Sequence, residues 1–196
     1  MPACDRGYWR RDDPMKFHST EVAGAFIVEP EPRRDDRGFL ARTFCVEEFG
    51  QHGLHFAPVQ SYQSRSHRKG TVRGLHYQVA PAAESKLVRC IVGAIYDVIL
   101  DVRPDSPTYL RSFGVELAAD NRLALYVPEL VAHGTQALTD GAELLCLAGH
   151  AYAPECERGV RYDDPILGNR WPLPTVEVSL KDLAWPPLRS AVGAPR

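Results

Sequence analysis

Eight short segments between residues 57 and 149 have the character of β-strands, and their regular spacing constrains the fold more than any other feature of the sequence. The candidate strands span residues 57–66, 71–78, 86–92, 94–103, 112–118, 122–127, 131–138 and 143–149. Most are separated by glycine, proline, aspartate or asparagine, residues that favour turns. Many short strands at even spacing are typical of an antiparallel sandwich or barrel, so the sequence predicts an all-β fold.

The segment 94–103 indicates how these strands pack. One face carries Tyr96, Val98, Leu100 and Val102, and the other carries Asp97, Ile99, Asp101 and Arg103. Side chains alternate between the two faces of a strand, so this pattern predicts a sheet that is buried on one side.

Outside this region the pattern is less regular. We expect a first strand over residues 22–28, a short helix over 46–52 and a helical turn near residues 179–182. The proline-rich residues 172–188 are expected to form an extended tail packed over the barrel. The predicted organisation is a poorly ordered N-terminal extension over residues 1–20, a single domain over 21–187 and a C-terminal tail over 188–196.

Composition excludes several classes of protein. The hydrophobic fraction of 44% and the charged fraction of 24% are those of a soluble globular chain. The net charge is −2 and the basic residues are scattered, so we expect no nucleic-acid or membrane partner. The five cysteines contain no CxxC pair, which argues against a disulfide framework or a zinc site and favours a cytoplasmic location. No apolar stretch has the length of a membrane span or a signal sequence.

The residues with the clearest chemistry lie between positions 70 and 90. If strands 71–78 and 86–92 form a hairpin centred on Pro81, His76 lies opposite Lys86, with Cβ atoms about 5 Å apart. A lysine beside a histidine favours the neutral imidazole, which can act as a general base. The lysine could also stabilise an enolate. This group suits an anionic ligand that loses a proton.

Arg73 adds a donor for phosphate, but its position imposes a condition. Strict alternation would place Arg73 and His76 on opposite faces of the strand. Both can reach one ligand only if Gly74 interrupts the pleat. Taken singly, each of these residues is more often structural or solvated than catalytic, so the prediction depends on the grouping.

Three stretches resemble the dTDP-4-dehydrorhamnose 3,5-epimerase family: Arg73-Gly-Leu-His-Tyr-Gln78, Lys86-Leu-Val-Arg-Cys90 and Asp101-Val-Arg-Pro-Asp-Ser-Pro-Thr108. Shorter matches include Asp36-Arg-Gly38, Ala132-His-Gly134, Glu157-Arg-Gly-Val160 and Ser179-Leu-Lys-Asp182. The resemblance covers about residues 21–187, in order. It implies a cupin-type jelly-roll barrel with one or two short helices, in a chain that forms a homodimer.

The resemblance also implies a reaction that needs no cofactor and no metal. The substrate would be a nucleotide-linked 4-keto-6-deoxyhexose, epimerised at C3, at C5 or at both through an enolate. The resemblance assigns the base to His76, the orientation of that base to Asp182 and stabilisation of the enolate to Lys86. It assigns substrate contacts to Arg37, Gln60, Arg73, His133, Glu157 and Lys181.

Cys146 stands where the family has the tyrosine that returns the proton. A thiol could donate a proton, but free cysteines usually behave as small buried apolar residues, and we favour that interpretation here. Tyr152 matches another tyrosine of the family and could supply the proton instead, as could a water molecule. The proton donor therefore stays open between these alternatives.

The part of the site that reads the nucleotide base also differs. Arg42 stands where the family has a glutamate, and Tyr62 stands where it has an asparagine near Gln60. Thymine offers an N–H donor, which a carboxylate can accept and a guanidinium cannot. We keep Arg42 and Tyr62 among the expected substrate contacts, and we expect dTDP as the nucleotide from the resemblance.

Three alternatives to a double epimerase follow. Loss of the tyrosine favours an enzyme that inverts one centre. A non-catalytic binder of nucleotide sugars is a second alternative, although such a protein has little use for His76 and Asp182. A metal-dependent cupin is the third, but such sites commonly use a His-x-His pair, and the sequence here reads His76-Tyr-Gln78.

Overall fold

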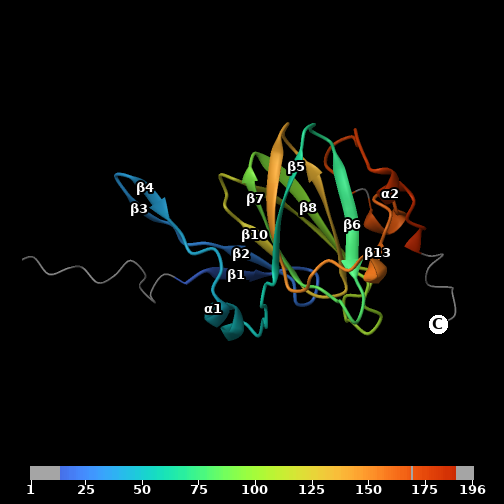
Figure 1. Ribbon diagram of the computed structural model, residues 1–196. Helices are drawn as coiled ribbons and strands as arrows, with labels where there is room; N and C mark the ends of the chain where they lie inside the picture. The colour runs from blue at the N-terminus through green and yellow to red at the C-terminus, as the bar shows by residue number, and fades with distance from the viewer. Residues whose placement is uncertain (1–13, 169, 189–196) are drawn as a thin grey trace, which may run out of the picture.

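Two antiparallel β-sheets face one another in the computed structural model, which describes residues 14–168 and 170–188 (Figure 1). The six-stranded sheet contains, in spatial order, β1 (Lys16–Ser19), β2 (Phe26–Glu29), β10 (Ala124–Val127), β7 (Lys86–Val92), β12 (Ala142–Ala148) and β5 (Gln60–Ser66). The five-stranded sheet contains β13 (Glu157–Gly159), β6 (Val72–Gln78), β11 (Val131–Ala137), β8 (Ala94–Asp101) and β9 (Ser112–Ala118). The expected all-β jelly-roll fold is therefore confirmed.

The remaining elements are short. They are the hairpin of β3 (Arg33–Asp35) and β4 (Gly38–Leu40), the helices α1 (Val46–Gln51) and α2 (Leu180–Leu183), and the 3-10 turns η1 (Pro154–Cys156) and η2 (Pro165–Leu167). The β3–β4 hairpin projects from the sandwich on the side away from α2 (Figure 1). Among the described residues, no helix has the length and apolar character that a membrane span needs.

The core between the sheets follows from the period of two along the strands. In β12 the buried side chains are Ala142, Leu144, Cys146 and Ala148, at every second position. The first three of them pack in one cluster with residues of both sheets, such as Val88 of β7 and Ile99 of β8. The eight segments expected as strands all form strands, with ends that shift by a few residues.

Strand β8 corrects the expectation of a sheet buried on one side. Asp97 and Asp101 are 0% exposed, and Ile99 between them lies in the core between the sheets. The opposite face, with Val98 and Leu100, packs against apolar residues of the segment that follows β13, such as Leu167. This C-terminal segment covers the outer face, so both faces of β8 are buried.

The N-terminal part of the chain is more ordered than expected. Strand β1 lies inside the predicted extension over residues 1–20 and pairs with β2. Phe17 of β1 packs edge-on against Phe49 of α1 at 5.1 Å between ring centroids, and the Met15 N–H donates to Glu48 at 2.7 Å. Residues 1–13 lie outside the described part of the chain. The first expected strand begins later, at Phe26, because Gly24 has a φ of 81° within a turn.

The hairpin expected between strands β6 and β7 does not form. Strand β6 pairs with β11 and β13 in one sheet, and β7 pairs with β10 and β12 in the other. Residues 79–85 cross between the sheets, which in such sandwiches lie about 10 Å apart. The proposed register of His76 opposite Lys86 is therefore wrong, although both residues still face the same space between the sheets.

The predicted interruption at Gly74 is confirmed. His133 pairs with His76 and Thr135 pairs with Arg73, so three steps along β6 match two steps along β11. This bulge turns the Arg73 and His76 side chains toward one cavity. Gly74 has a φ of 106°, and a Cβ atom there would lie 2.6 Å from the His133 carbonyl oxygen.

The expected tail is also confirmed in its described part. Gln136 of β11 exchanges two hydrogen bonds with the Leu173 backbone, at 2.9 and 3.0 Å. The Val72 N–H donates to the Glu177 carbonyl at 2.8 Å. These contacts lead the chain along β6 to the predicted helical turn, which is α2. Leu188 is buried, and residues 189–196 lie outside the described residues.

Replacing Gly74 with alanine should destabilise the protein. The new Cβ would meet backbone atoms at 2.6 and 2.7 Å, and the φ is unfavourable for alanine. We expect the free energy of unfolding to fall by more than about 1 kcal/mol, as measured by denaturant titration. Gly50→Ala is the control, because its Cβ would meet no atom within 4 Å. Equal stability of the two variants would contradict the bulge argument.

Candidate active site

Two adjoining cavities open between the sheets, with volumes of about 400 and 360 Å³. Four residues line both of them: Tyr62 from β5, His76 from β6, His133 from β11 and Lys181 from α2. Arg73 and Asp182 line the first cavity, and Gln60, Lys86, Tyr152 and Glu157 line the second. The sandwich thus brings most of the expected site residues to one place.

His76 is held by Asp182. The Asp182 carboxylate contacts His76 Nε2 at 2.6 Å and accepts a hydrogen bond from the Gly74 N–H at 3.1 Å. Burial opposes ionisation of Asp182, but these hydrogen bonds prevail and hold its pKa below the usual value. Because an ionised Asp182 accepts a hydrogen bond from the Nε2–H group, Nδ1 of His76 is the ring nitrogen that can take up a proton.

The backbone of α2 fixes Asp182 in this position. Ser179 caps the helix by accepting a hydrogen bond from the Asp182 N–H at 3.1 Å. Ser179 therefore caps the helix, and the Asp182 side chain is available to His76.

Lys86 is buried beside His76. Its side chain is 6% exposed, and its ammonium contacts Glu84 at 2.9 Å and donates to the His76 carbonyl at 3.3 Å. The ammonium is thus paired with a carboxylate and lies next to the histidine backbone. Sequence reasoning missed Glu84, which lies in the crossing segment, where no periodic pattern marks it.

His133 forms a second histidine–aspartate pair. Its Nε2 contacts the carboxylate of Asp97 at 3.0 Å, and Asp97 is fully buried on the neighbouring strand β8. His133 is the direct partner of His76 across the β6–β11 ladder. Sequence reasoning did not identify Asp97 as a site residue, although a carboxylate inside a buried strand is a signal for one.

A third charged group surrounds Glu157. Its carboxylate contacts Lys181 Nζ at 2.5 and 2.6 Å and accepts a hydrogen bond from the Tyr152 hydroxyl at 2.7 Å. Burial would raise the pKa of Glu157, but these two partners lower it. The same hydrogen bond raises the pKa of Tyr152. The Gln60 side chain accepts the Tyr152 N–H at 3.0 Å and completes this wall of the second cavity.

Arg73 lies at the first cavity and is exposed. Its guanidinium donates to the Ser66 hydroxyl at 3.2 Å and to the Arg65 carbonyl at 2.9 Å. Both acceptors belong to the end of β5, so Arg73 spans from one sheet to the other. An anionic group in the first cavity would meet this arginine.

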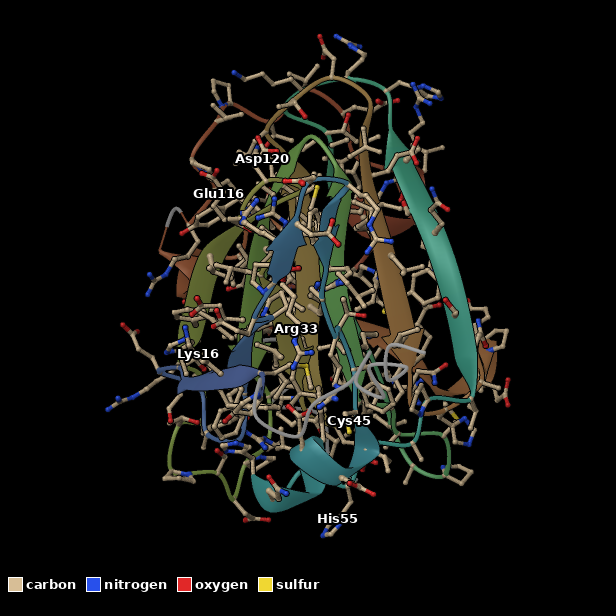
Figure 2. The ribbon with its side chains drawn as sticks, turned by 90° about the vertical axis from the view of Figure 1, so that its left-hand side faces the viewer. Lys16, Arg33, Cys45, His55, Glu116 and Asp120 are labelled. Carbon is tan, nitrogen blue, oxygen red and sulfur yellow. The ribbon has the colours of Figure 1, made fainter. Side chains whose placement is uncertain are left out.

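Two expected substrate contacts lie elsewhere. Arg37 is in the turn of the β3–β4 hairpin, where it contacts Asp35 at 2.5 Å. Arg42 pairs with Glu48 of α1 and lines a separate cavity. Figure 2 shows this side of the molecule, with Arg33 on the hairpin and Cys45 next to α1. Neither Arg37 nor Arg42 lines the two cavities that contain His76.

Cys146 and Tyr62 face one another on β12 and β5. Cys146 is fully buried, and burial raises the pKa of its thiol to about 11. Burial also raises the pKa of Tyr62. The Tyr62 side chain, in contrast to Cys146, is 39% exposed and lines both cavities.

The arrangement offers acid–base chemistry within a cavity that has cationic groups. A histidine with one free nitrogen, an oriented carboxylate and a buried ammonium suit removal of a proton next to a carbonyl group. Within the part of the chain that the structure describes, no three His, Cys, Asp or Glu side chains gather as a metal site requires.

Residues 19–190 match the family model described as dTDP-4-dehydrorhamnose 3,5-epimerase. The enzyme of that name from Methanothermobacter thermautotrophicus is 41% identical over 89% of this chain and 95% of its own length. The crystal structure of the enzyme from Elizabethkingia anophelis superimposes with a TM-score of 0.86, at 33% identity over 90% of this chain and 97% of that one.

A further solved structure is that of ChmJ, a 3'-monoepimerase from Streptomyces bikiniensis in complex with dTDP-quinovose. It has a TM-score of 0.83 and 35% identity, and the match covers 89% of each chain. With a family model over most of its length and relatives above 30% identity, this chain belongs to the dTDP-4-dehydrorhamnose 3,5-epimerase family.

Proposed function

We propose that this protein is an epimerase of a nucleotide-linked 4-keto-6-deoxyhexose in deoxysugar biosynthesis, with dTDP as the nucleotide. The observation that carries the proposal is the pair of His76 and Asp182, held at 2.6 Å beside the buried Lys86 in the space between the sheets. The dTDP-quinovose bound to ChmJ supports the choice of nucleotide.

The reaction begins with a hydrogen on a carbon next to the 4-keto group. The ketone makes the hydrogens at C3 and C5 acidic, because the electrons of the broken C–H bond move into an enolate. His76 Nδ1 takes up the proton, and Asp182 stabilises the resulting imidazolium through Nε2. Lys86 places its positive charge where the enolate oxygen develops.

The polar residues around this centre would bind the rest of the substrate. Arg73 and His133 suit the diphosphate, since a guanidinium forms paired hydrogen bonds with phosphate oxygens. Gln60, Glu157 and Lys181 line the second cavity and could bind sugar hydroxyl groups. His133 keeps its orientation through Asp97, as His76 does through Asp182.

A single inverted centre is the second candidate outcome. Cys146 replaces the tyrosine that returns the proton in the family, and the structural relative ChmJ is named as a 3'-monoepimerase. Proton abstraction by His76 is the same in both cases. The difference lies in the carbon atoms at which a proton returns on the opposite face.

We also propose a homodimer. The β3–β4 hairpin projects from the sandwich and presents Phe39, which is 51% exposed, and Leu40, which is 37% exposed (Figure 1). Arg37 in this hairpin does not line the cavities of its own chain. A second copy of the chain would cover these two apolar side chains of β4 and bring Arg37 to the neighbouring site.

Solvent exchange tests the proposed reaction. In D₂O, the wild-type protein should introduce deuterium at C3, at C5 or at both carbons of a dTDP-linked 4-keto-6-deoxyglucose. NMR measures the deuterium at each carbon. His76→Asn should lower the exchange rate by 10²-fold or more, because it removes the base. His55→Asn, which alters an exposed histidine after α1, should leave the rate unchanged. Tight binding without exchange at either carbon would instead favour a non-catalytic binder.

Mixed dimers test the contribution of Arg37. Arg37→Ala and His76→Asn chains should each have low activity as homodimers. Mixing equal amounts of the two chains should restore about a quarter of the wild-type activity. About half the dimers are then mixed, and one of the two sites in each mixed dimer is intact. Light scattering should report the mass of a dimer. A monomer in solution, or mixed chains that stay inactive, would contradict the shared site.

A further inference from the structure

The residue that takes the place of the family's proton donor has no access to the substrate. Cys146 is 0% exposed and packs in the core between the sheets with Val88 and Leu144. It is not among the described residues that line either cavity. Its thiol therefore lies behind the cavity wall, where it cannot reach a carbon atom of the sugar.

Tyr62 forms that part of the wall. It is the direct partner of Cys146 in the β5–β12 ladder, so the two side chains lie on the same face of the sheet. Paired residues on neighbouring strands have Cβ atoms about 5 Å apart, so a tyrosine can extend over its partner. The Tyr62 phenol thus occupies space that a large side chain at position 146 would need.

Relative to the family pattern, the large and the small side chain have exchanged places between positions 62 and 146. The family has a small amide side chain where this chain has Tyr62, and a tyrosine where it has Cys146. Cores tolerate paired substitutions that conserve the total volume. The phenol is therefore retained at this location but is anchored on the neighbouring strand.

Tyr62 and His76 approach the cavity from opposite sides. Tyr62 lies on β5, the edge strand of the six-stranded sheet, and His76 lies on β6 of the five-stranded sheet (Figure 1). Both side chains line both cavities. A sugar ring between the sheets would have the base on one face and the phenol on the other, as inversion requires.

Tyr152 is less suited to this role. Its hydroxyl donates to the ionised Glu157 at 2.7 Å, and its side chain is 53% exposed. It lines only the second of the two cavities that contain His76.

We propose that Tyr62 is the catalytic acid that returns a proton to the enolate carbon on the face opposite His76. This assignment rests on the proposed epimerase function. The Tyr62 O–H bond breaks and a C–H bond forms at the carbon that His76 deprotonated, while the enolate electrons restore the 4-keto group. The tyrosinate then regains a proton and the imidazolium loses one, both by exchange with water.

The substitution Tyr62→Phe removes the hydroxyl and keeps the ring. We expect the rate of epimer formation to fall by 10²-fold or more, the contribution typical of a general acid. Deuterium should still enter the substrate from D₂O with retained configuration, because His76 and Lys86 are intact. A variant that had only lost its structure would lose deuterium exchange and epimer formation together. Epimer formation at the wild-type rate would overturn the assignment.

Tyr152→Phe is the matched control, since it removes the other phenol near the site. Its loss of epimer formation should be smaller than that of Tyr62→Phe by at least about tenfold. The opposite order would assign the acid to Tyr152. Wild-type protein without any exchange would instead contradict the proposed function itself, and the two failures are thereby distinguished.

A second variant tests the exchange of positions directly. Tyr62→Asn should abolish epimer formation, and adding Cys146→Tyr should restore it, because the phenol returns to the space between the two strands. Cys146→Tyr alone should lower the melting temperature, since two phenols would compete for that space. A stable double variant that binds dTDP and gives no epimer would overturn the proposal.

Discussion

The carboxylate of Asp182 connects the end of the fold to the strand that carries the base. Asp182 lies on α2, and its two oxygens bind the His76 ring and the Gly74 N–H. The same contact therefore sets the tautomer of the histidine and holds α2 against the bulge in β6. Without the bulge, Arg73 and His76 would face opposite sides, and without α2 the histidine would have no partner for Nε2.

Four basic side chains of the site each contact a carboxylate. Asp182 accepts from His76, Asp97 from His133, Glu84 from Lys86 and Glu157 from Lys181. A charge that leaves water without a partner costs several kcal/mol, so such pairing is what allows these groups to lie between the sheets. A substrate with its own anionic groups can share these basic partners, because each is already oriented.

Much of the fold could be predicted because strands have a simple period. Turn residues and alternation located the eight strands between β5 and β12, and Ser179 marked the start of α2. The pairing of β6 with β7 was wrong, since the sequence separation that favours a hairpin also permits a crossing between sheets. The expectation that only one face of β8 is buried was also wrong. The second face is covered by a segment that lies more than sixty residues further along the chain and contains Leu167.

The sequence by itself determined the chemistry available, because the histidine, lysine and aspartate of the family pattern are present as His76, Lys86 and Asp182. It also marked Cys146 and Tyr62 as departures, each seen separately. Only the tertiary structure placed them together: β5 and β12 lie next to one another in the sheet, and position 62 faces position 146. Strand pairing is a long-range property that depends on how two sheets fold over each other, so no local pattern in the chain could have brought these two residues into contact.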